Sequence, residues 1–169
     1  LDTEVAQTAT PTFQHNTNAT AATTNTFTLG VNDSNTGNAT ADATSAVAGL
    51  AFTDIQALTL DLGALNLTTS VDITGADLET VTVTGTGALS FGTQTLTGDA
   101  TNRVTLDASA LEGVVTMRLD GTANGAATIS TGTDADLITI DGISGAVAGM
   151  DITGNAGSDS VTVTANGDG

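Results

Sequence analysis

The 169-residue sequence contains no cysteine, tryptophan, tyrosine or lysine, and its only long cations are Arg103 and Arg118, against 19 acidic residues. Without cysteine, no disulfide framework can hold the fold, and cysteine usage does not decide the cellular compartment. Aromatic residues usually supply much of the core of a compact domain, but here they are limited to four phenylalanines. The core must therefore come from valine, isoleucine, leucine and threonine.

The charge balance narrows the choice of partner. A formal net charge of -17 strongly disfavours nucleic acid and anionic membrane surfaces. It favours cations, calcium above all, because carboxylate and carbonyl oxygens are the ligands that this ion prefers. No apolar run approaches the length of about 18 residues that a membrane span needs, and no basic segment precedes an apolar one as in a signal peptide. Because the chain opens with Leu1, we expect a fragment of a longer protein, with any targeting signal outside it.

Groups that carry enzymatic chemistry are scarce. The chain has one histidine, His15, and shows no acid and base pair, no Ser/His/Asp set and no phosphate-binding loop. An enzyme would have to depend on carboxylates alone. Carbohydrate-active β-helices can do so, but they usually carry aromatic and basic residues for sugar binding, which are missing here. We therefore expect a protein that is not an enzyme.

A period of 23 residues aligns residues 53–167 as five lines without an insertion. One column of this alignment contains Leu60, Val83, Leu106, Ile129 and Ile152. A second contains Val71, Met117, Ile140 and Val163, interrupted only by Gln94. A fixed period indicates repeating units that bury their apolar faces against their neighbours. The sequence therefore predicts an all-β fold, a parallel β-solenoid of the β-helix or β-roll kind with about 23 residues per coil.

Within each coil, alternation of apolar residues and threonine predicts two main strands. The first strand begins with Leu58–Leu60 and recurs at each repeat, and the second includes residues 71–73, 117–119 and Ile140. Helix has little support because threonine, glycine, asparagine and valine dominate. The handedness of parallel crossovers favours a right-handed coil.

The chain divides into an irregular segment rich in threonine, alanine and asparagine, residues 1–52, and a regular solenoid of five coils, residues 53–169. Two islands in the first part, residues 25–31 and 46–52, have the character of strands. One further column at the same spacing would place early coils within residues 1–52; it contains Phe27, Leu50, Ile73, Leu96 and Leu119.

The corner between the two strands changes character along the chain. In the first three coils it carries Leu65, Ala88 and Leu111 at one apolar position. In the last two coils it reads GTDAD and NAGSD, which places Asp136 and Asp159 in the same column. Stacked carboxylates without a basic neighbour repel each other unless a cation lies between them or water reaches them. The corner is thus either a metal site or a solvated acidic turn.

The segments TGTDADLIT (residues 131–139) and GNAGSDSVT (residues 154–162) resemble the glycine and aspartate nonapeptide of RTX proteins, which binds calcium between coils of a parallel β-roll. Asn155 replaces one glycine of that motif, and Thr131 and Asp134 replace two others. The resemblance implies calcium ligands at Asp134, Asp136, Asn155, Gly157 and Asp159, with a carbonyl from Gly132. A weaker match to this motif contains Asp77 and Glu79. There, an ordinary coil corner is the better interpretation.

The segments DIQALTLDL (54–62), DLETVTVTG (77–85) and RVTLDASALEG (103–113) resemble repeats of bacterial surface-layer (S-layer) proteins of the RTX type, as in the Caulobacter-like surface layer. The resemblance implies a protein exported by a type I system to the bacterial cell surface. There it would fold on meeting calcium and assemble with copies of itself into a lattice, with cell-surface polysaccharide as a further partner. An alternative is a spacer or binding segment of a large secreted RTX adhesin, and a carbohydrate-active β-helix is a third.

Overall fold

A computed structural model describes residues 12–14, 25–31, 49–74, 78–94, 104–120, 127–143 and 151–165. These residues form thirteen β-strands joined by turns, and none of them is helical, which confirms the all-β prediction. Within these ranges, no helix long and apolar enough to cross a membrane occurs. The strands are β1 (Thr12–Gln14), β2 (Thr26–Gly30), β3 (Gly49–Thr53), β4 (Ala57–Asp61), β5 (Leu67–Thr74), β6 (Thr80–Gly85), β7 (Leu89–Gln94), β8 (Val104–Leu111), β9 (Val115–Asp120), β10 (Ala127–Ser130), β11 (Leu137–Ile143), β12 (Asp151–Thr153) and β13 (Ser160–Ala165).

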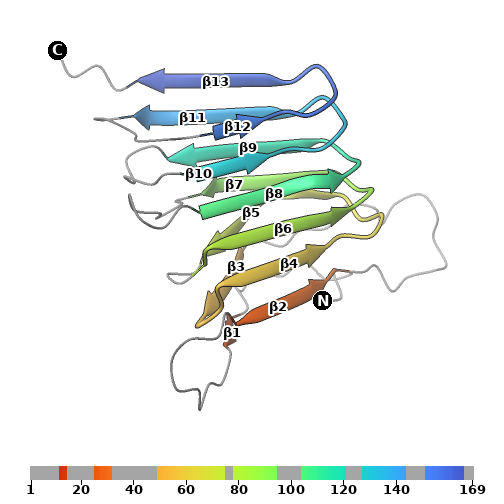
Figure 1. The fold of residues 1–169 in the computed structure, drawn as a ribbon, viewed down its shortest axis with the longest axis vertical. Helices are drawn as coiled ribbons and strands as arrows, with labels where there is room; N and C mark the ends of the chain where they lie inside the picture. Colours follow the sequence, from red (N-terminus) through yellow and green to blue (C-terminus); the bar gives the residue numbers. More distant parts are fainter. Residues whose placement is uncertain are drawn as a thin grey trace.

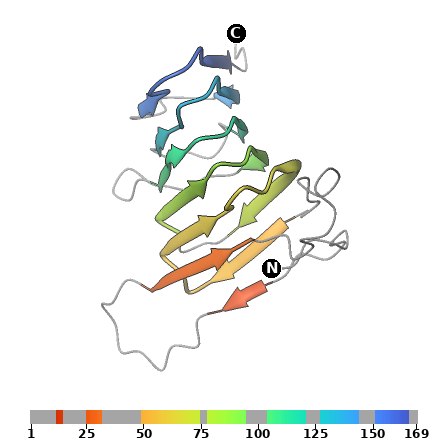
Figure 2. The same cartoon turned by 90° about the vertical axis from the view of Figure 1, so that its right-hand side faces the viewer.

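The chain alternates between two parallel sheets. The odd-numbered strands form one sheet in the order β1-β3-β5-β7-β9-β11-β13, and the even-numbered strands form the other in the order β12-β10-β8-β6-β4-β2. All described neighbours pair in parallel. We call an even-numbered strand and the odd-numbered strand that follows it a layer. The layers stack along the long axis of the molecule (Figures 1 and 2). The prediction of parallel sheets is confirmed.

The core lies between the two sheets and is mainly aliphatic. In β4, Leu58 and Leu60 are buried while Thr59 between them is half-buried, as expected for side chains that alternate between the two faces of a sheet. Outward threonines lie side by side, for example Thr59 next to Thr82. β-Branched side chains pack well on such a surface, so the composition of the chain suits the sheet.

The spacing of 23 residues holds where β3 pairs with β5, β4 with β6, β8 with β10, β10 with β12 and β11 with β13. It fails where β5 pairs with β7, β6 with β8, β7 with β9 and β9 with β11.

Where the spacing of 23 holds, it pairs Leu60 with Val83 across β4 and β6, and Ile129 with both Leu106 and Ile152 across β8, β10 and β12. Between β6 and β8, however, Leu106 pairs with Val81, so the single column predicted through Val83 and Leu106 is wrong. Relative to the spacing of 23, the displacement is two residues from Thr80 to Thr82 and three at Thr84 and Gly85, because the register shifts between Thr82 and Thr84. The even part of the displacement keeps Val81 and Leu106 on the same, inward face.

The interruption of the second column at Gln94 also disappears in the structure. Val71 pairs with Phe91 and not with Gln94, since the register shifts within the pairing of β5 and β7. Phe91 is buried, so this register places an aromatic side chain in the core. The pairing of Ile140 with Val163 is as predicted, whereas Met117 pairs with Ile138.

Strands β2 and β3 join the sheets from within the segment before residue 54. β2 lies inside the predicted island 25–31 and pairs with β4, and β3 overlaps the island 46–52 and pairs with β5. Leu50 pairs with Ile73 as predicted. Phe27 does not belong to that column, because it pairs with Leu58 in the other sheet. Its ring packs against that of Phe52, with the centroids 6.0 Å apart. Leu96, His15 and Asp77 lie outside the described residues.

Candidate functional site

The change from apolar to acidic residues occurs where the chain enters the seven-stranded sheet. Leu67, Leu89 and Val115 lie beside one another at the starts of β5, β7 and β9, and all three are buried. Asp136 and Asp159 immediately precede β11 and β13, one residue before the paired positions Leu137 and Ser160. The same position is thus aliphatic in three layers and acidic in the last two.

The register corrects one part of the predicted corner. The apolar residues that precede the aspartates in the stack are Leu67, Leu89 and Val115, and not the column of Leu65, Ala88 and Leu111. That column came from a constant spacing, and the register shifts described above displace it. The prediction that Asp136 and Asp159 stack on each other is confirmed, because their layers pair at the predicted spacing.

Asp136 joins three layers. Its side chain is only 2% exposed, and its Oδ1 accepts a hydrogen bond of 2.8 Å from the backbone N–H of Val115 in the layer before it. Its own backbone N–H donates to Oδ1 of Asp159 in the layer after it, at 3.1 Å, and its carbonyl oxygen accepts from the N–H of Ser160 at 2.8 Å. A carboxylate of one layer therefore caps an N–H of the preceding layer, twice in succession.

The second carboxylate oxygen of Asp136, Oδ2, makes no such hydrogen bond. Oδ2 is buried, and among the described residues it has no hydrogen-bond partner. Leaving a buried polar atom without a partner is costly, and more so when it belongs to a charged group. Native proteins satisfy nearly all such atoms with a protein group, a water molecule or an ion. Oδ2 of Asp136 is therefore the atom at this corner that most requires a further partner.

Asn155 and Gly157 shape the turn before Asp159. Both have positive φ angles, 58° and 116°, which few residues other than glycine and asparagine adopt. A Cβ at Gly157 would lie 2.3 Å from the carbonyl oxygen of Asp134, so the two corners approach too closely for any side chain there. The side-chain amide of Asn155 donates to the carbonyl oxygen of Thr131. Asn155 thus fulfils the backbone role of the glycine it replaces and adds a bond between layers.

Gly132 and Gly154 are needed for close contact. A Cβ at Gly132 would lie 2.0 Å from the carbonyl oxygen of Leu111 in the layer before it. A Cβ at Gly154 would lie 2.1 Å from Oδ2 of Asp159, so the carboxylate of the last layer rests against the backbone of its own corner. Sequence reasoning missed Gly154 and Val115 as parts of the site. Gly154 could have been identified from the sequence, because it is a glycine at a coil corner. Val115 could not, because its role depends on the register of the strands.

Thr131 is a further buried polar residue at this corner. It is fully buried; its N–H donates to the carbonyl oxygen of Thr153 at 3.0 Å and its hydroxyl to that of Gly154 at 3.4 Å. Thr131, which replaces a glycine of the nonapeptide, therefore makes hydrogen bonds between layers. Asp134 is exposed.

Two carboxylates are the acidic donors that this corner could offer to a cation. No group of three or more His, Cys, Asp or Glu side chains able to share a metal ion occurs among the residues that the structure describes. A cation at the corner would have the carboxylates of Asp136 and Asp159, and it would complete its shell with carbonyl and water oxygens. Calcium accepts such oxygens, and sites with few charges in extracellular modules have dissociation constants of about 10⁻⁴ to 10⁻³ M.

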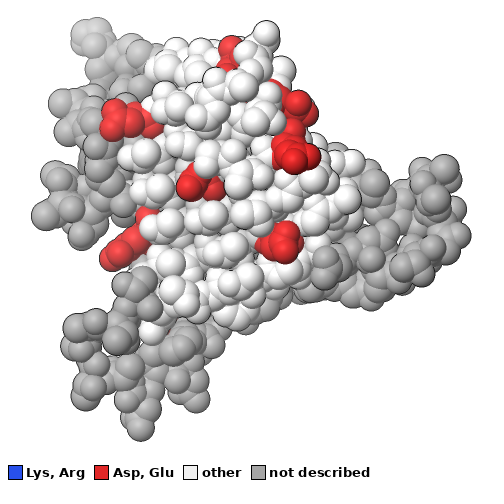
Figure 3. Space-filling model, turned by 45° about the vertical axis from the view of Figure 1, so that its right-hand side comes forward, with Lys and Arg blue, Asp and Glu red and all other residues white. Residues whose placement is uncertain are grey.

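Other acidic residues behave differently. Asp107 Oδ1 accepts from the N–H and the hydroxyl of Ser109 in its own turn, at 3.0 and 2.6 Å. Glu79 is exposed, and its N–H donates to the carbonyl oxygen of Gln56, which fits the ordinary corner expected there. Acidic side chains are spread over the face shown in Figure 3, most of them apart from one another. Asp136 is the only buried acidic residue among those whose side chains the structure describes.

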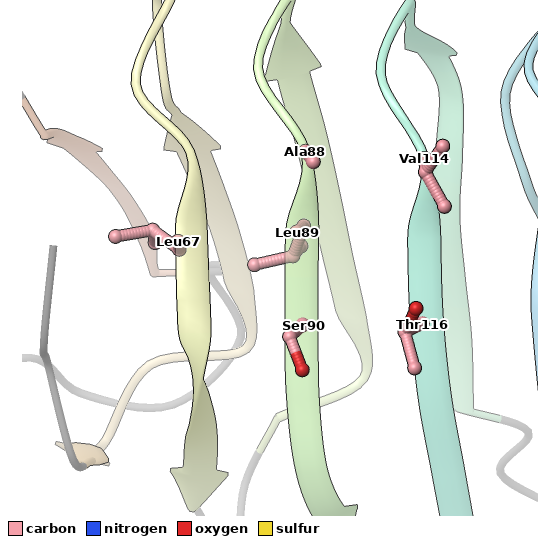
Figure 4. A pocket seen from close by; sticks show the side chains of 6 residues that line it. All are labelled: Leu67, Ala88, Leu89, Ser90, Val114 and Thr116. Atoms are coloured by element: carbon pink, nitrogen blue, oxygen red, sulfur yellow. The ribbon is translucent and has the colours of Figure 1, made fainter. Parts of the chain in front are cut away.

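A small cavity on the seven-stranded sheet offers little chemistry. Its volume of about 220 Å³ is below the roughly 300–1,000 Å³ typical of ligand pockets. Ser90 and Thr116 lie side by side on β7 and β9 and provide its hydroxyl groups (Figure 4). The remaining lining is aliphatic: Leu67, Ala88, Leu89 and Val114. No titratable group is among these six lining residues.

Neither a protein-family model nor a curated protein nor a solved structure matches this chain. Function is therefore inferred from its own residues.

Proposed function

We propose that this chain is a structural segment of a secreted bacterial cell-surface protein, a right-handed parallel β-solenoid that calcium stabilises and that assembles with copies of itself into a surface layer. Each layer would be one coil of about 23 residues. The alternation of consecutive strands between two parallel sheets supports a solenoid. The surface layer follows from the sequence resemblance, and the role would be mechanical and not enzymatic.

The observation that carries the calcium part is the buried Oδ2 of Asp136. Without a partner, this oxygen destabilises the last two layers. A calcium ion between Asp136 and Asp159 would compensate both carboxylates and attach one layer to the next. Oxygens of Gly132, Asp134, Asn155 and Gly157, the positions of the nonapeptide, would complete its coordination together with water.

The overall charge gives calcium a second effect. At a net charge of -17, copies of the chain repel one another where calcium is scarce. Divalent cations outside the cell would reduce that repulsion and order the corner at the same time. The same ion would thus couple folding to assembly at the place where assembly is useful.

The test is a calcium titration followed by circular dichroism and light scattering, on the wild type and on Asp136→Asn. Asparagine keeps an oxygen that can accept from Val115 but removes the buried charge. In chelator, we expect Asp136→Asn to raise the free energy of unfolding by about 1 kcal/mol. Calcium at 100 times its dissociation constant should stabilise the wild type by about 2.7 kcal/mol, and the variant by far less.

Asp107→Asn is the matched control, because it removes the same charge from a carboxylate that caps its own turn. It should retain the calcium response of the wild type. If unfolding, strand content and scattering of the wild type are indifferent to calcium and to chelator, the calcium proposal is wrong.

A spacer segment of a secreted adhesin is the second candidate. It is favoured by the stacking of all layers along one axis, which lengthens the molecule in one direction (Figure 1). A spacer needs calcium for stiffness but not for association. Calcium that changes the circular dichroism while the scattering mass stays monomeric would favour the spacer over the surface layer.

A further inference from the structure

The two aspartates of the acidic corner use Oδ1 in the same way. In each, Oδ1 accepts from a backbone N–H of the layer before it: Val115 donates to Asp136 at 2.8 Å, and Asp136 donates to Asp159 at 3.1 Å. Oδ2 of Asp136 stays buried and without a partner among the described residues. In Asp136, one oxygen therefore fixes the carboxylate, and the other remains for a ligand.

The N–H of Val115 lies where the ladder between β9 and β11 begins. Val115 is the first residue of β9, and the first described pair of the two strands is Thr116 with Leu137, one residue later. The acceptor of this N–H is a side chain in place of a carbonyl, and the bond is buried. Its loss would leave both a buried N–H and a buried carboxylate oxygen unsatisfied, which is costly.

The contacts that bring Asp136 to Val115 need no ion. β8 pairs with β10 through Leu106 and Ile129, and β9 pairs with β11 through Met117 and Ile138. All four of these side chains are buried. Backbone pairing and apolar packing form this layer boundary, so Oδ1 of Asp136 can be held before a cation arrives.

We propose that the layer of β8 and β9 sets the calcium affinity of the corner, with the N–H of Val115 as the group that positions Asp136. The corner becomes competent to bind calcium only after β9 and β11 have paired, so the aliphatic layers fold first and serve as a template for the ion site. The proposal rests on the proposed function, since it states what orients the ligands of that ion.

Val115→Pro tests the hydrogen bond in the full 169-residue chain. Proline lacks the N–H and is accepted at the first residue of a strand, so β9 can keep its other pairs. Val115→Ala is the matched control, because it keeps the N–H and loses part of a buried side chain. Calcium affinity is measured by NMR titration of the amide signals of Asp136 and Ser160, and stability by urea unfolding in chelator.

We expect Val115→Pro to bind calcium at least about tenfold more weakly than the wild type, because the ion must then order the carboxylate itself. Val115→Ala should stay within about threefold of the wild-type affinity, although its urea midpoint falls. Equal weakening in the two variants would overturn the proposal, since packing and not the N–H would order the corner. An unchanged or higher affinity in Val115→Pro would overturn it as well, since the hydrogen bond would then compete with the ion.

The order of assembly has a kinetic consequence. An ion that binds after β9 and β11 have paired stabilises contacts that the folding transition state lacks. In stopped-flow experiments, calcium should therefore slow the unfolding of the wild type and change its refolding rate by less than about twofold. Refolding that calcium accelerates about tenfold would overturn the proposal, because the ion would then act before the layers pair.

Hydrogen exchange in chelator separates this proposal from the calcium role. The N–H of Val115 should be protected in the wild type without calcium, since its acceptor belongs to the chain. If it is unprotected, the proposal fails whatever calcium does. If it is protected and calcium moves no amide signal, the proposed function fails and the affinity set by Val115 fails with it. If calcium binds the wild type and Val115→Pro equally, only the present proposal fails.

Discussion

The layers up to β9 and the layers from β10 onward build the same corner in two ways. In the first region Leu67, Leu89 and Val115 fill it with buried aliphatic side chains. In the second, Asp136 and Asp159 occupy it and cap backbone N–H groups of the preceding layer. Both solutions keep the layers in register. The aliphatic corner depends on exclusion of water, whereas the acidic corner depends on directed hydrogen bonds.

The difference shows what an acidic corner makes possible. A buried leucine stabilises its layer under all conditions. Asp136 leaves one buried oxygen without a described partner, so the stability of its layer depends on what else is present. We therefore expect the second region, and not the first, to respond to cations.

The largest expected change in the free energy of unfolding comes from introducing an aspartate at the aliphatic corner. Leu89→Asp would bury a carboxylate among leucines and should lower the free energy of unfolding by about 4 kcal/mol. Chemical denaturation followed by circular dichroism measures it. The control is Val114→Asp, at a residue 37% exposed, which should change stability by less than about 1 kcal/mol. Equal losses in both variants would contradict the burial of Leu89 at the aliphatic corner.

A smaller effect is expected where two layers touch through backbone. Gly132→Ala places a Cβ against the carbonyl oxygen of Leu111 and should cost about 2 kcal/mol, because backbone cannot move aside as a side chain can. Thermal unfolding measures the loss, and Thr133→Ala at the exposed neighbouring position provides the baseline. An unchanged unfolding temperature would show that these layers are not in close contact.

The smallest expected loss of stability concerns substitutions of Asn155. Asn155→Gly keeps the positive φ and loses the amide hydrogen bond to Thr131, with an expected cost of about 1 kcal/mol or less. Asn155→Ala loses the hydrogen bond and also strains the backbone, which adds about 1 kcal/mol. The order asparagine, glycine, alanine in denaturant midpoint is the prediction. A midpoint for alanine above that for glycine would contradict the role of φ.

Much of the fold followed from the alternation of residues. The strand at Leu58–Leu60 and its repeats were predictable because threonine and aliphatic residues alternate there, and alternation fixes which face is buried. The displacement between β6 and β8 was not predictable by the same means. A shift of two residues leaves the alternation unchanged, so the pattern is equally consistent with Val81 or Val83 beside Leu106.

About as much of the candidate site as of the fold could be predicted from the sequence. Constant spacing brought Asp136 and Asp159 together, since β11 and β13 keep that spacing. It did not identify Val115 as the donor to Asp136, because the register between β9 and β11 differs from it. The burial of one aspartate and the exposure of the other follow from their distance to the end of the stack, which spacing alone does not express.

The two-residue displacement between β6 and β8 has a genetic counterpart. Gain or loss of two codons within a strand preserves which of its later residues face the core, so the remaining repeats need no further change. Gain or loss of one codon within a strand reverses the faces of every residue up to the next turn and places threonine where leucine was, whereas a segment that joins two strands absorbs either change. Repeats of this kind are therefore expected to differ in length by even numbers of residues wherever a strand continues through the change.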